Sequence, residues 1–147
     1  MHDTCRILVT GSNGFVGEAL FNYLQDVEQY HVSGSVRTAD VARENLFTVS
    51  ELSENTDWFD ALKGQHVVVH VAARAHVMDD SVGEPLAEYR RVNVAGTLNL
   101  ARQAASAGVS RFIFISSIKV NGESTIIGSP FQHLDKAMPK DPYGISK

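Results

Sequence analysis

Hydrophobic and polar positions follow two alternating patterns along the chain, one typical of buried strands and one typical of amphipathic helices. Short runs of apolar and β-branched residues predict five strands, at residues 6–10, 31–37, 45–49, 65–73 and 111–117. Apolar residues at three- and four-residue intervals, together with capping residues, predict the helices between them, at residues 14–29, 56–64 and 85–108. Because each parallel connection must cross over the sheet through a helix, the alternation predicts an α/β fold with a doubly wound parallel sheet.

The pattern changes after the fifth predicted strand. Residues 118–141 contain glycine and proline residues and few periodic apolar positions, which predicts a long loop. Long loops in compact domains usually have a function. Asp141 and Pro142 are typical of the cap and first turn of a helix, so we expect a further helix to begin there.

The composition fits one globular domain, which we expect to extend over residues 1–147, with 44% hydrophobic and 20% charged residues. The formal net charge is -4 without a block of like charges, so we expect no nucleic-acid or membrane partner and favour dissolved small molecules. The sequence shows no apolar run long enough for a spanning helix and no pattern of a secretion signal. The lone Cys5 cannot form an internal disulfide, and we expect a cytoplasmic location.

A glycine-rich turn, TGSNGFVG, stands between the first predicted strand and the first helix. Its spacing alone also fits a flexible turn, but its place in the first βαβ unit favours dinucleotide binding. In that role Gly11 allows the tight turn, Gly14 lets the backbone approach a pyrophosphate, and Gly17 lets helix and strand pack closely. Free N–H groups at the helix start would favour the phosphates. The residues expected to contact the cofactor here are Gly11, Asn13, Gly14, Phe15, Val16 and Gly17.

The end of the second predicted strand bears on the choice of cofactor. An acidic residue there would bind the ribose 2′-hydroxyl of NAD, whereas an arginine accommodates the 2′-phosphate of NADP. The sequence has Arg37 at this point and no acid before Asp40. We therefore expect NAD or NADP with a slight preference for NADP. Arg37 could instead be a solvated surface residue or stack on adenine.

Tyr143 and Lys147 form a Y-x-x-x-K pair after the long predicted loop, and their spacing puts both side chains on one helix face. Lowering a tyrosine pKa by about 3 units needs roughly 4 kcal/mol, to which a nearby ammonium contributes. Tyr143 could then take a proton from a substrate hydroxyl while hydride leaves the same carbon. Ser116 and Ser117 end the fifth predicted strand, where a serine can hold that hydroxyl or simply close the strand.

The segments TGSNGFVG, HVAA, NVAGTLNL, FIFISS followed by VNG, and YGISK occur in the order seen in extended short-chain dehydrogenases/reductases. The chain resembles the nucleotide-sugar epimerase branch of that family, similar to UDP-glucose 4-epimerases. The resemblance implies a Rossmann-like NAD(P)-binding domain. It also implies Ser117, Tyr143 and Lys147 as catalytic residues, with Tyr143 and Lys147 contacting the cofactor as well. Asn93 would support the geometry of the site, unless its side chain only forms hydrogen bonds within its own helix.

The same resemblance places Ala72 and Ala73 along the cofactor and suggests a UDP-sugar as substrate. A homodimer is possible for the full-length protein. Family members that dehydrate nucleotide sugars have an Asp-Glu pair after the serine, whereas this chain has Ile118-Lys119, which disfavours a dehydratase. Asn121 stands where many epimerases have tyrosine, so contacts in that part of the sugar pocket stay open.

These observations favour an NAD(P)-dependent nucleotide-sugar epimerase. One alternative is an NADP-dependent nucleotide-sugar reductase or dehydrogenase. Another is a non-catalytic dinucleotide-binding module, against which the retained serine, tyrosine and lysine argue.

The resemblance further implies that strands and a substrate lobe follow the lysine, so we expect an N-terminal part of a longer enzyme, itself inactive. We expect residues from about 119 onward to be poorly ordered, with Tyr143 and Lys147 away from catalytic geometry.

A cluster of histidines around the fourth predicted strand, His66, His70 and His76, lies near Asp79 and Asp80. Neighbouring strand positions face opposite sides, and no compact ligand spacing is present, so we expect packing and hydrogen-bonding roles and no metal site.

Trp58 and the Arg90-Arg91 pair are expected to have structural roles rather than to bind a ligand. Trp58 is expected in the core rather than as a ligand platform. Arg90-Arg91 is expected to be a solvated helix face.

Overall fold

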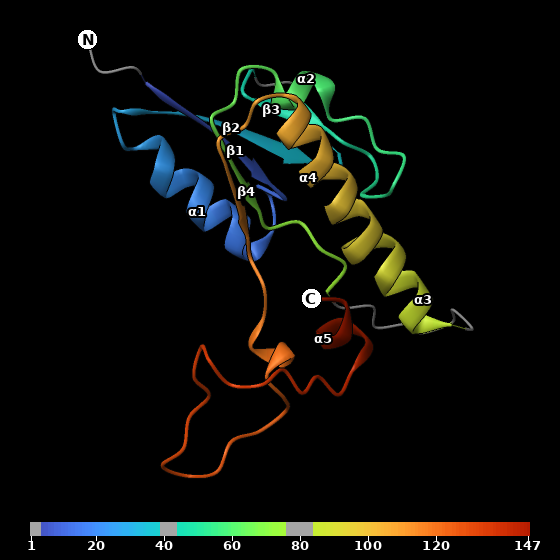
Figure 1. The fold of residues 1–147 in the computed structure, drawn as a ribbon. Coiled ribbons are helices and arrows are strands. Elements are labelled where there is room, and N and C mark those ends of the chain that lie inside the picture. Colours follow the sequence, from blue (N-terminus) through green and yellow to red (C-terminus); the bar gives the residue numbers. More distant parts are fainter. Residues whose placement is uncertain (1–3, 39–43, 76–83) are drawn as a thin grey trace.

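The computed structural model describes residues 4–38, 44–75 and 84–147 (Figure 1). Its centre is a five-stranded sheet with the order β3-β2-β1-β4-β5, and all neighbouring strands pair in parallel. The strands are β1 (Cys5–Thr10), β2 (Tyr30–Val36), β3 (Leu46–Thr48), β4 (Val67–His70) and β5 (Arg111–Phe114). The chain runs outward from β1 to β3 and then returns to the other side of β1 at β4. The predicted doubly wound α/β fold is confirmed.

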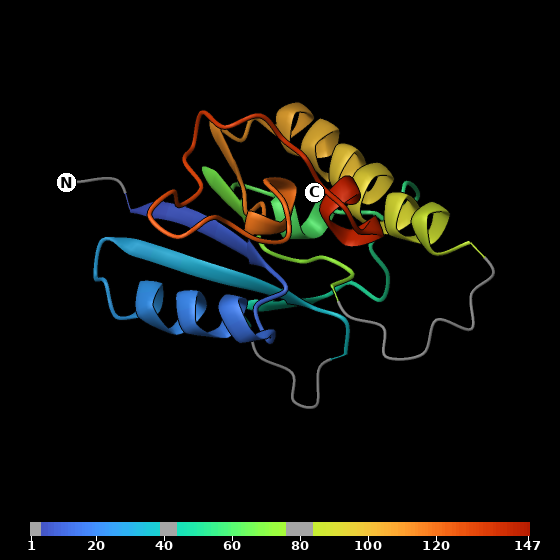
Figure 2. The same cartoon turned by 90° about the horizontal axis from the view of Figure 1, so that it is seen from below.

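Helices cover both faces of the sheet, as Figures 1 and 2 show from two directions. The helical segments are α1 (Phe15–Gln25), α2 (Phe59–Leu62), α3 (Pro85–Tyr89), η1 (Arg90–Gly96), α4 (Thr97–Ser106), η2 (Ile118–Val120) and α5 (Pro142–Ser146). Helix α1 lies on one face, whereas α2 and α4 lie on the other. None of the helices in the described ranges combines the length and apolar character needed to cross a bilayer.

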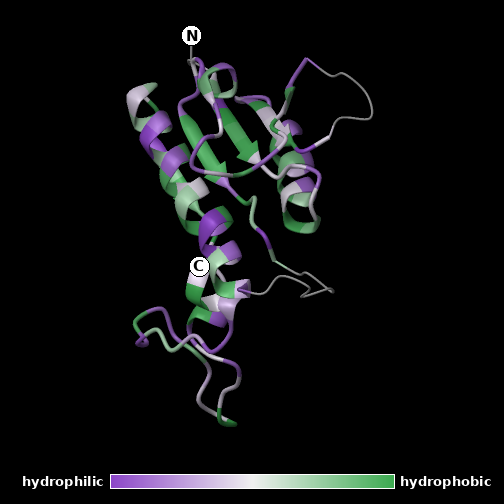
Figure 3. Cartoon of the chain, turned by 90° about the vertical axis from the view of Figure 1, so that its right-hand side faces the viewer, coloured by the Kyte–Doolittle hydropathy of each residue, from purple (hydrophilic) through white to green (hydrophobic). Residues whose placement is uncertain are grey.

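The alternation of side chains along β1 divides the core between the two faces. Leu8 points toward α2 and α4, where it packs in a cluster that includes Trp58 and Leu100. Ile7 and Val9 point the other way, into a cluster completed by α1. Figure 3 shows that the central strands are largely apolar. Trp58 is 1% exposed, which confirms its expected place in the core.

The long helix predicted over residues 85–108 is present as three consecutive segments, α3, η1 and α4. Its middle segment, η1, is wound as a π-helix. This geometry is rare in proteins overall, but where it occurs it is often at a functional site. Asn93 lies in this segment and is 3% exposed. The wider winding thus occurs where a polar side chain is turned into the protein.

Several predicted elements extend further in the sequence pattern than in the structure, among them β4, α1 and α2. Strand β4 ends at His70 because the next backbone N–H groups, of Val71 and Ala72, donate to the Thr10 hydroxyl instead of a strand. Helix α1 ends at Gln25, and a turn then leads directly into β2. Helix α2 begins at Phe59, since the preceding segment is a loop held by side-chain hydrogen bonds.

Residues after β5 lead through η2 and a long loop to α5, and the loop extends away from the sheet (Figure 1). The side chain of Asp141 accepts a hydrogen bond from the Gly144 N–H at 2.6 Å, which confirms the predicted helix cap. Helix α5 packs against α3 and η2. In place of the poorly ordered tail expected from the sequence, the structure has a formed helix at this end.

Candidate functional site

A cavity of about 650 Å³ opens at the carboxyl ends of β1, β2 and β4. This edge is where ligands of open α/β sheets bind, at the point where the strand order reverses. The wall contains every cofactor-contacting residue expected from the sequence, namely Gly11, Asn13, Gly14, Phe15, Val16, Gly17, Arg37, Ala72, Ala73, Tyr143 and Lys147. Positions up to 136 residues apart in the sequence therefore meet at one concave surface.

The glycine-rich turn has a backbone conformation that residues with side chains could not adopt without strain. Gly11 has φ of 67°, in the left-handed region that favours glycine. A Cβ at Gly17 would lie 2.0 Å from the Gly11 carbonyl oxygen, so helix α1 and the turn can approach only because Gly17 has no side chain. The Gly11 backbone angle and the close approach at Gly17 together fix where α1 begins at the cavity wall.

The N-terminus of α1 is suited to bind an anion. Gly14 is the N-cap residue, and no side chain in the described structure accepts from the first N–H groups of this helix. Phe15 is 98% exposed, so its backbone is not covered by neighbouring elements. Uncapped N–H groups at the positive end of a helix dipole form a site for phosphate oxygens. The residues of this turn therefore fit the diphosphate of a dinucleotide.

The turn after β4 lies directly against the glycine-rich turn. A Cβ at Gly11 would be 3.0 Å from the Ala72 Cα, which shows how closely the two backbones approach. The Thr10 hydroxyl oxygen accepts from the N–H groups of Val71 and Ala72, each at 3.1 Å. The Thr10 side chain thus connects the end of β1 to the segment that contributes Ala72 and Ala73 to the cavity.

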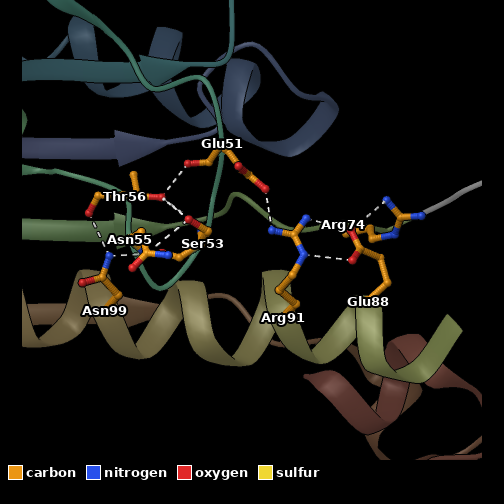
Figure 4. Close-up of polar contacts among 8 residues, drawn as sticks. All are labelled: Glu51, Ser53, Asn55, Thr56, Arg74, Glu88, Arg91 and Asn99. Carbon is orange, nitrogen blue, oxygen red and sulfur yellow. Dashed lines mark hydrogen bonds and ion pairs between the residues drawn. The ribbon is translucent and has the colours of Figure 1, made fainter. Parts of the chain in front are cut away.

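An ion-pair network forms another part of the wall (Figure 4). The Arg91 guanidinium forms two hydrogen bonds with the Glu88 carboxylate, at 2.8 and 2.9 Å, and also donates to Glu51. Arg74 approaches Glu88 at 3.8 Å. Arg91 therefore joins the helix to the segment after β3. Its side chain is 45% exposed, as expected of a solvated helix face, but the sequence did not predict its ion pairs. Glu51 lies 40 positions away, too far for the sequence to indicate the pair.

The network also changes proton affinities. The hydrogen bond from Arg91 holds the pKa of the Glu88 carboxyl below its ordinary value, with smaller contributions from the charges of Arg91 and Arg74. Hydrogen bonds to Glu88 and Glu51 raise the pKa of Arg91, so this guanidinium stays charged.

Asn93 connects two segments that contribute to the cavity, although it is not on the cavity wall. Its side-chain oxygen accepts from the Arg74 N–H at 2.8 Å, and its Nδ2 donates to the Arg74 carbonyl at 3.0 Å. The same Nδ2 donates to Ser146 Oγ at 2.8 Å, and Ser146 donates to the Tyr143 carbonyl at 2.7 Å. Ser146 was not singled out in the sequence, where its only signal is its place inside YGISK.

Tyr143 and Lys147 lie on the cavity wall together with Ser116. The Tyr143 ring packs edge-on against Tyr89, with ring centroids 6.3 Å apart, and Lys147 Nζ lies 4.4 Å from the centroid of the Phe114 ring. Burial lowers the pKa of the Lys147 ammonium. The pair was expected to lie away from catalytic geometry beside Ser117. The structure places both residues on the same wall as the glycine-rich turn, and Ser117 is not on that wall.

Ser117 occupies a different position from Ser116. Its hydroxyl oxygen accepts from the Lys119 N–H at 3.2 Å and caps η2, and Ser117 is not on the cavity wall. Lys119 in turn contacts Glu123 at 2.5 Å and Asp141 at 3.1 Å, so it connects η2 to the cap of α5. Hydrogen bonds to these two carboxylates, first that of Glu123, raise the pKa of Lys119.

The histidines near β4 have hydrogen-bonding roles where the structure describes them. His66 Nδ1 accepts from the Arg6 N–H at 3.2 Å, and His70 is buried between two threonines. His76, Asp79 and Asp80 lie outside the described residues. Within residues 4–38, 44–75 and 84–147, no three His, Cys, Asp or Glu side chains gather as a metal site requires.

The chain is similar to characterised enzymes along nearly its whole length. The UDP-glucose 4-epimerase of Vibrio cholerae is 54% identical over 143 residues, which cover 96% of this chain and 43% of that protein. The UDP-glucose 4-epimerase of Mus musculus is 31% identical, with 97% of this chain and 46% of that protein covered. The chain therefore spans less than half the length of these relatives.

Solved structures show the same fold. A short-chain dehydrogenase/reductase superfamily protein from Agrobacterium tumefaciens with bound NAD matches with a TM-score of 0.77 and 32% identity, over 97% of this chain and 42% of that one. UDP-glucuronic acid 4-epimerase from Bacillus cereus, in complex with UDP-glucuronic acid and NAD, matches with a TM-score of 0.78 and 28% identity, over 97% and 48% of the two chains.

A family model described as the NAD dependent epimerase/dehydratase family matches residues 7–147. This match includes most of β1, the glycine-rich turn, the strands that follow and the Tyr143/Lys147 pair. The chain belongs to the NAD dependent epimerase/dehydratase family.

Proposed function

We propose that the protein is an NAD(P)-dependent nucleotide-sugar epimerase, of which this chain forms the cofactor-binding part and a UDP-sugar is the substrate. The observation that carries the proposal is the meeting of the glycine-rich turn, the Ala72-Ala73 segment and the Tyr143/Lys147 pair at one cavity. The names of the similar proteins support the substrate class, since several are UDP-sugar 4-epimerases. Ile118-Lys119 in place of an Asp-Glu pair after Ser117 favours an epimerase over a dehydratase.

The residues of the turn would hold the cofactor. The N–H groups at the start of α1 would bind the diphosphate, with Gly14 allowing close approach of the backbone. Ala72 and Ala73 would lie along the cofactor on the β4 side of the cavity. When bound, the nicotinamide group accepts hydride from a sugar carbon and returns it.

The chain's own residues would handle the proton. Tyr143 would take the proton of the sugar hydroxyl, and Lys147 would favour the phenolate through its positive charge. Ser117 would hold the same hydroxyl by a hydrogen bond. Asn93 would act through its bond to Ser146, which fixes the helix that carries Tyr143 and Lys147.

Arg37 bears on the finer choice of cofactor. The family is NAD dependent, and bound NAD is present in similar structures. Arg37 lies on the cavity wall directly after β2, where a guanidinium can bind a 2′-phosphate. We propose that NADP also binds, through Arg37. Calorimetric titration tests this: Arg37→Ala should weaken NADP binding and leave NAD binding nearly unchanged, and equal losses for both would contradict it.

The epimerase proposal is tested with the full-length protein and UDP-glucose or UDP-galactose, with product identified by chromatography. Conversion without added NADPH is expected of an epimerase, whereas stoichiometric NADPH consumption would indicate the alternative, a reductase. Tyr143→Phe should abolish conversion while the protein still binds NAD. Turnover that survives this change would contradict the proposed role of Tyr143, and absence of turnover with every UDP-sugar would favour the non-catalytic binding module.

A further inference from the structure

A buried polar cluster lies behind the cavity, among residues to which no catalytic or cofactor-contacting role is given above. His70, at the end of β4, is 0% exposed. Its Nδ1 lies 2.7 Å from the Thr10 hydroxyl oxygen, and its Nε2 lies 2.8 Å from the Thr97 hydroxyl oxygen. The imidazole thus connects β1 to the first residue of α4.

The hydrogen bonds of Thr10 determine the direction of its contact with His70. A hydroxyl group has one hydrogen to donate and two lone pairs to accept with. The N–H groups of Val71 and Ala72 both donate to the Thr10 oxygen, which uses both lone pairs. The Thr10 hydrogen is therefore the one that points at His70, and Nδ1 must be the acceptor.

The tautomer of His70 follows. A neutral imidazole with an accepting Nδ1 carries its proton on Nε2. That proton is donated to the Thr97 oxygen. A protonated imidazole would direct a second N–H at the Thr10 oxygen, which has no lone pair left to accept it.

The other groups around His70 also disfavour a charge. The Phe112 and Phe114 rings of β5 lie 5.9 and 6.0 Å from the imidazole, between centroids, and offer no counter-ion. Burial is the main reason that the pKa of His70 is lowered to about 4. The positive charge of Lys147, on the α5 side, acts in the same direction.

We propose that His70, as the neutral Nε2–H tautomer, is a positioning residue of the dinucleotide site, anchored by Thr97 and acting through the Thr10 hydroxyl. The proposal rests on the proposed function, because it assumes that the cavity binds a dinucleotide. By holding the Thr10 hydrogen, His70 keeps the Thr10 oxygen directed at Val71 and Ala72. The Gly11 and Ala72 backbones, which form adjacent parts of the cavity wall, are thereby kept in contact.

Nuclear magnetic resonance on the full-length protein tests the tautomer directly. A two-bond ¹H–¹⁵N correlation spectrum at neutral pH should show an unprotonated Nδ1 and a protonated Nε2 for His70. A protonated Nδ1, in either a neutral or a charged ring, would overturn the proposal. This measurement needs no cofactor and no variant, so it does not depend on whether the proposed function is correct.

The positioning role is tested with Thr97→Val and its matched control Thr97→Ser, using NAD as the ligand in calorimetric titration. Valine keeps the shape but removes the acceptor for Nε2–H, whereas serine keeps the acceptor. We expect NAD binding to weaken about tenfold with valine and less than about twofold with serine. Wild-type affinity in Thr97→Val, confirmed as folded by circular dichroism, would overturn the positioning role.

The outcomes separate this inference from the proposed function. If wild-type protein shows the expected tautomer but does not bind NAD, the proposed function fails, and the positioning role fails with it. If wild type binds NAD and both Thr97 variants bind equally well, only the positioning role fails. Should Thr97→Val not fold, the same comparison is made with Thr97→Ala, and the wild-type spectrum still decides the tautomer.

Discussion

Asn93 donates a hydrogen bond to Ser146, a residue 53 positions later in the chain, and both side chains are buried. The same carboxamide also binds both backbone polar groups of Arg74. One side chain therefore sets the distance between the segment after β4, which lines the cofactor side of the cavity, and α5, which carries Tyr143 and Lys147. Asn93 lies in the π-helical segment η1 and is buried there.

Asn93→Ala should lower both stability and turnover. The change leaves the Arg74 N–H and carbonyl without their partner, and a buried polar group left unsatisfied costs about 1–3 kcal/mol. We expect the free energy of unfolding in urea to fall by roughly 2–4 kcal/mol. Asn99→Ala is the control on the same helix, because among the residues that the structure describes the Asn99 side chain bonds only to the loop before α2 and to Gln103. Equal turnover in the two variants would contradict the account of Asn93.

Gly17→Ala should damage the turn itself. The new Cβ would lie 2.0 Å from the Gly11 carbonyl oxygen, so the turn or α1 must shift. Overpacking of this kind costs about 1–3 kcal/mol, measurable by urea denaturation, and we expect NAD binding to be lost as well. Gly14→Ala is the comparison, since its Cβ would meet the same oxygen at 3.4 Å, an ordinary contact.

The Gly14 variant should therefore fold normally and bind NAD more weakly, because its side chain fills the path of the diphosphate. The account of the turn fails if Gly17→Ala is as stable as wild type, or if Gly14→Ala binds NAD with unchanged affinity.

The two serines after β5 should differ in their effect on catalysis. Ser117 is the proposed catalytic residue, whereas only Ser116 lies on the cavity wall in this structure. We expect Ser117→Ala to reduce kcat by about a hundredfold or more, the range for loss of a group that assists proton transfer. Ser116→Ala should change kcat by less than about threefold. The reverse order in steady-state kinetics would transfer the catalytic role to Ser116.

The stability of the protein should depend on pH through His70. The pKa of His70 falls from 6.5 to about 4 on folding, so between these values the unfolded chain binds more protons than the folded one. The contribution of His70 to stability should be constant above pH 6.5 and fall as the pH decreases toward 4, by up to about 3 kcal/mol. His70→Gln should flatten the profile between pH 5 and 6.5 in urea denaturation. An unchanged slope would show that His70 is not the group responsible.

The sequence pattern predicted the order of strands and helices well, because buried parallel strands leave short apolar runs and helices leave apolar residues at every third and fourth position. The ends of elements were less predictable. The end of β4 depends on the Thr10 hydroxyl, 61 positions from Val71, and no local pattern contains that contact.

In the site, too, features of the local sequence could be predicted, and contacts between distant residues could not. Residues inside compact motifs, such as Gly11, Gly17 and Tyr143, could be predicted to share a site because the spacing itself reflects the chemistry, and the structure places them on one cavity wall. Contacts across the fold were missed: the ion pair of Arg91 with Glu51 was not predicted, although Arg91 is exposed as expected, and Ser146 was not considered. Such pairs exist only after the strands and helices have packed, so only the folded structure reveals them.

The central claim is that the N–H groups at the start of α1 bind the diphosphate of a dinucleotide. A crystal structure of the protein with NAD tests it most directly. The account predicts diphosphate density against the backbone of Phe15 and Val16, with the adenosine side toward Arg37 and the nicotinamide toward Tyr143. Diphosphate density at any other place, or no bound NAD at saturating concentration, would contradict the claim.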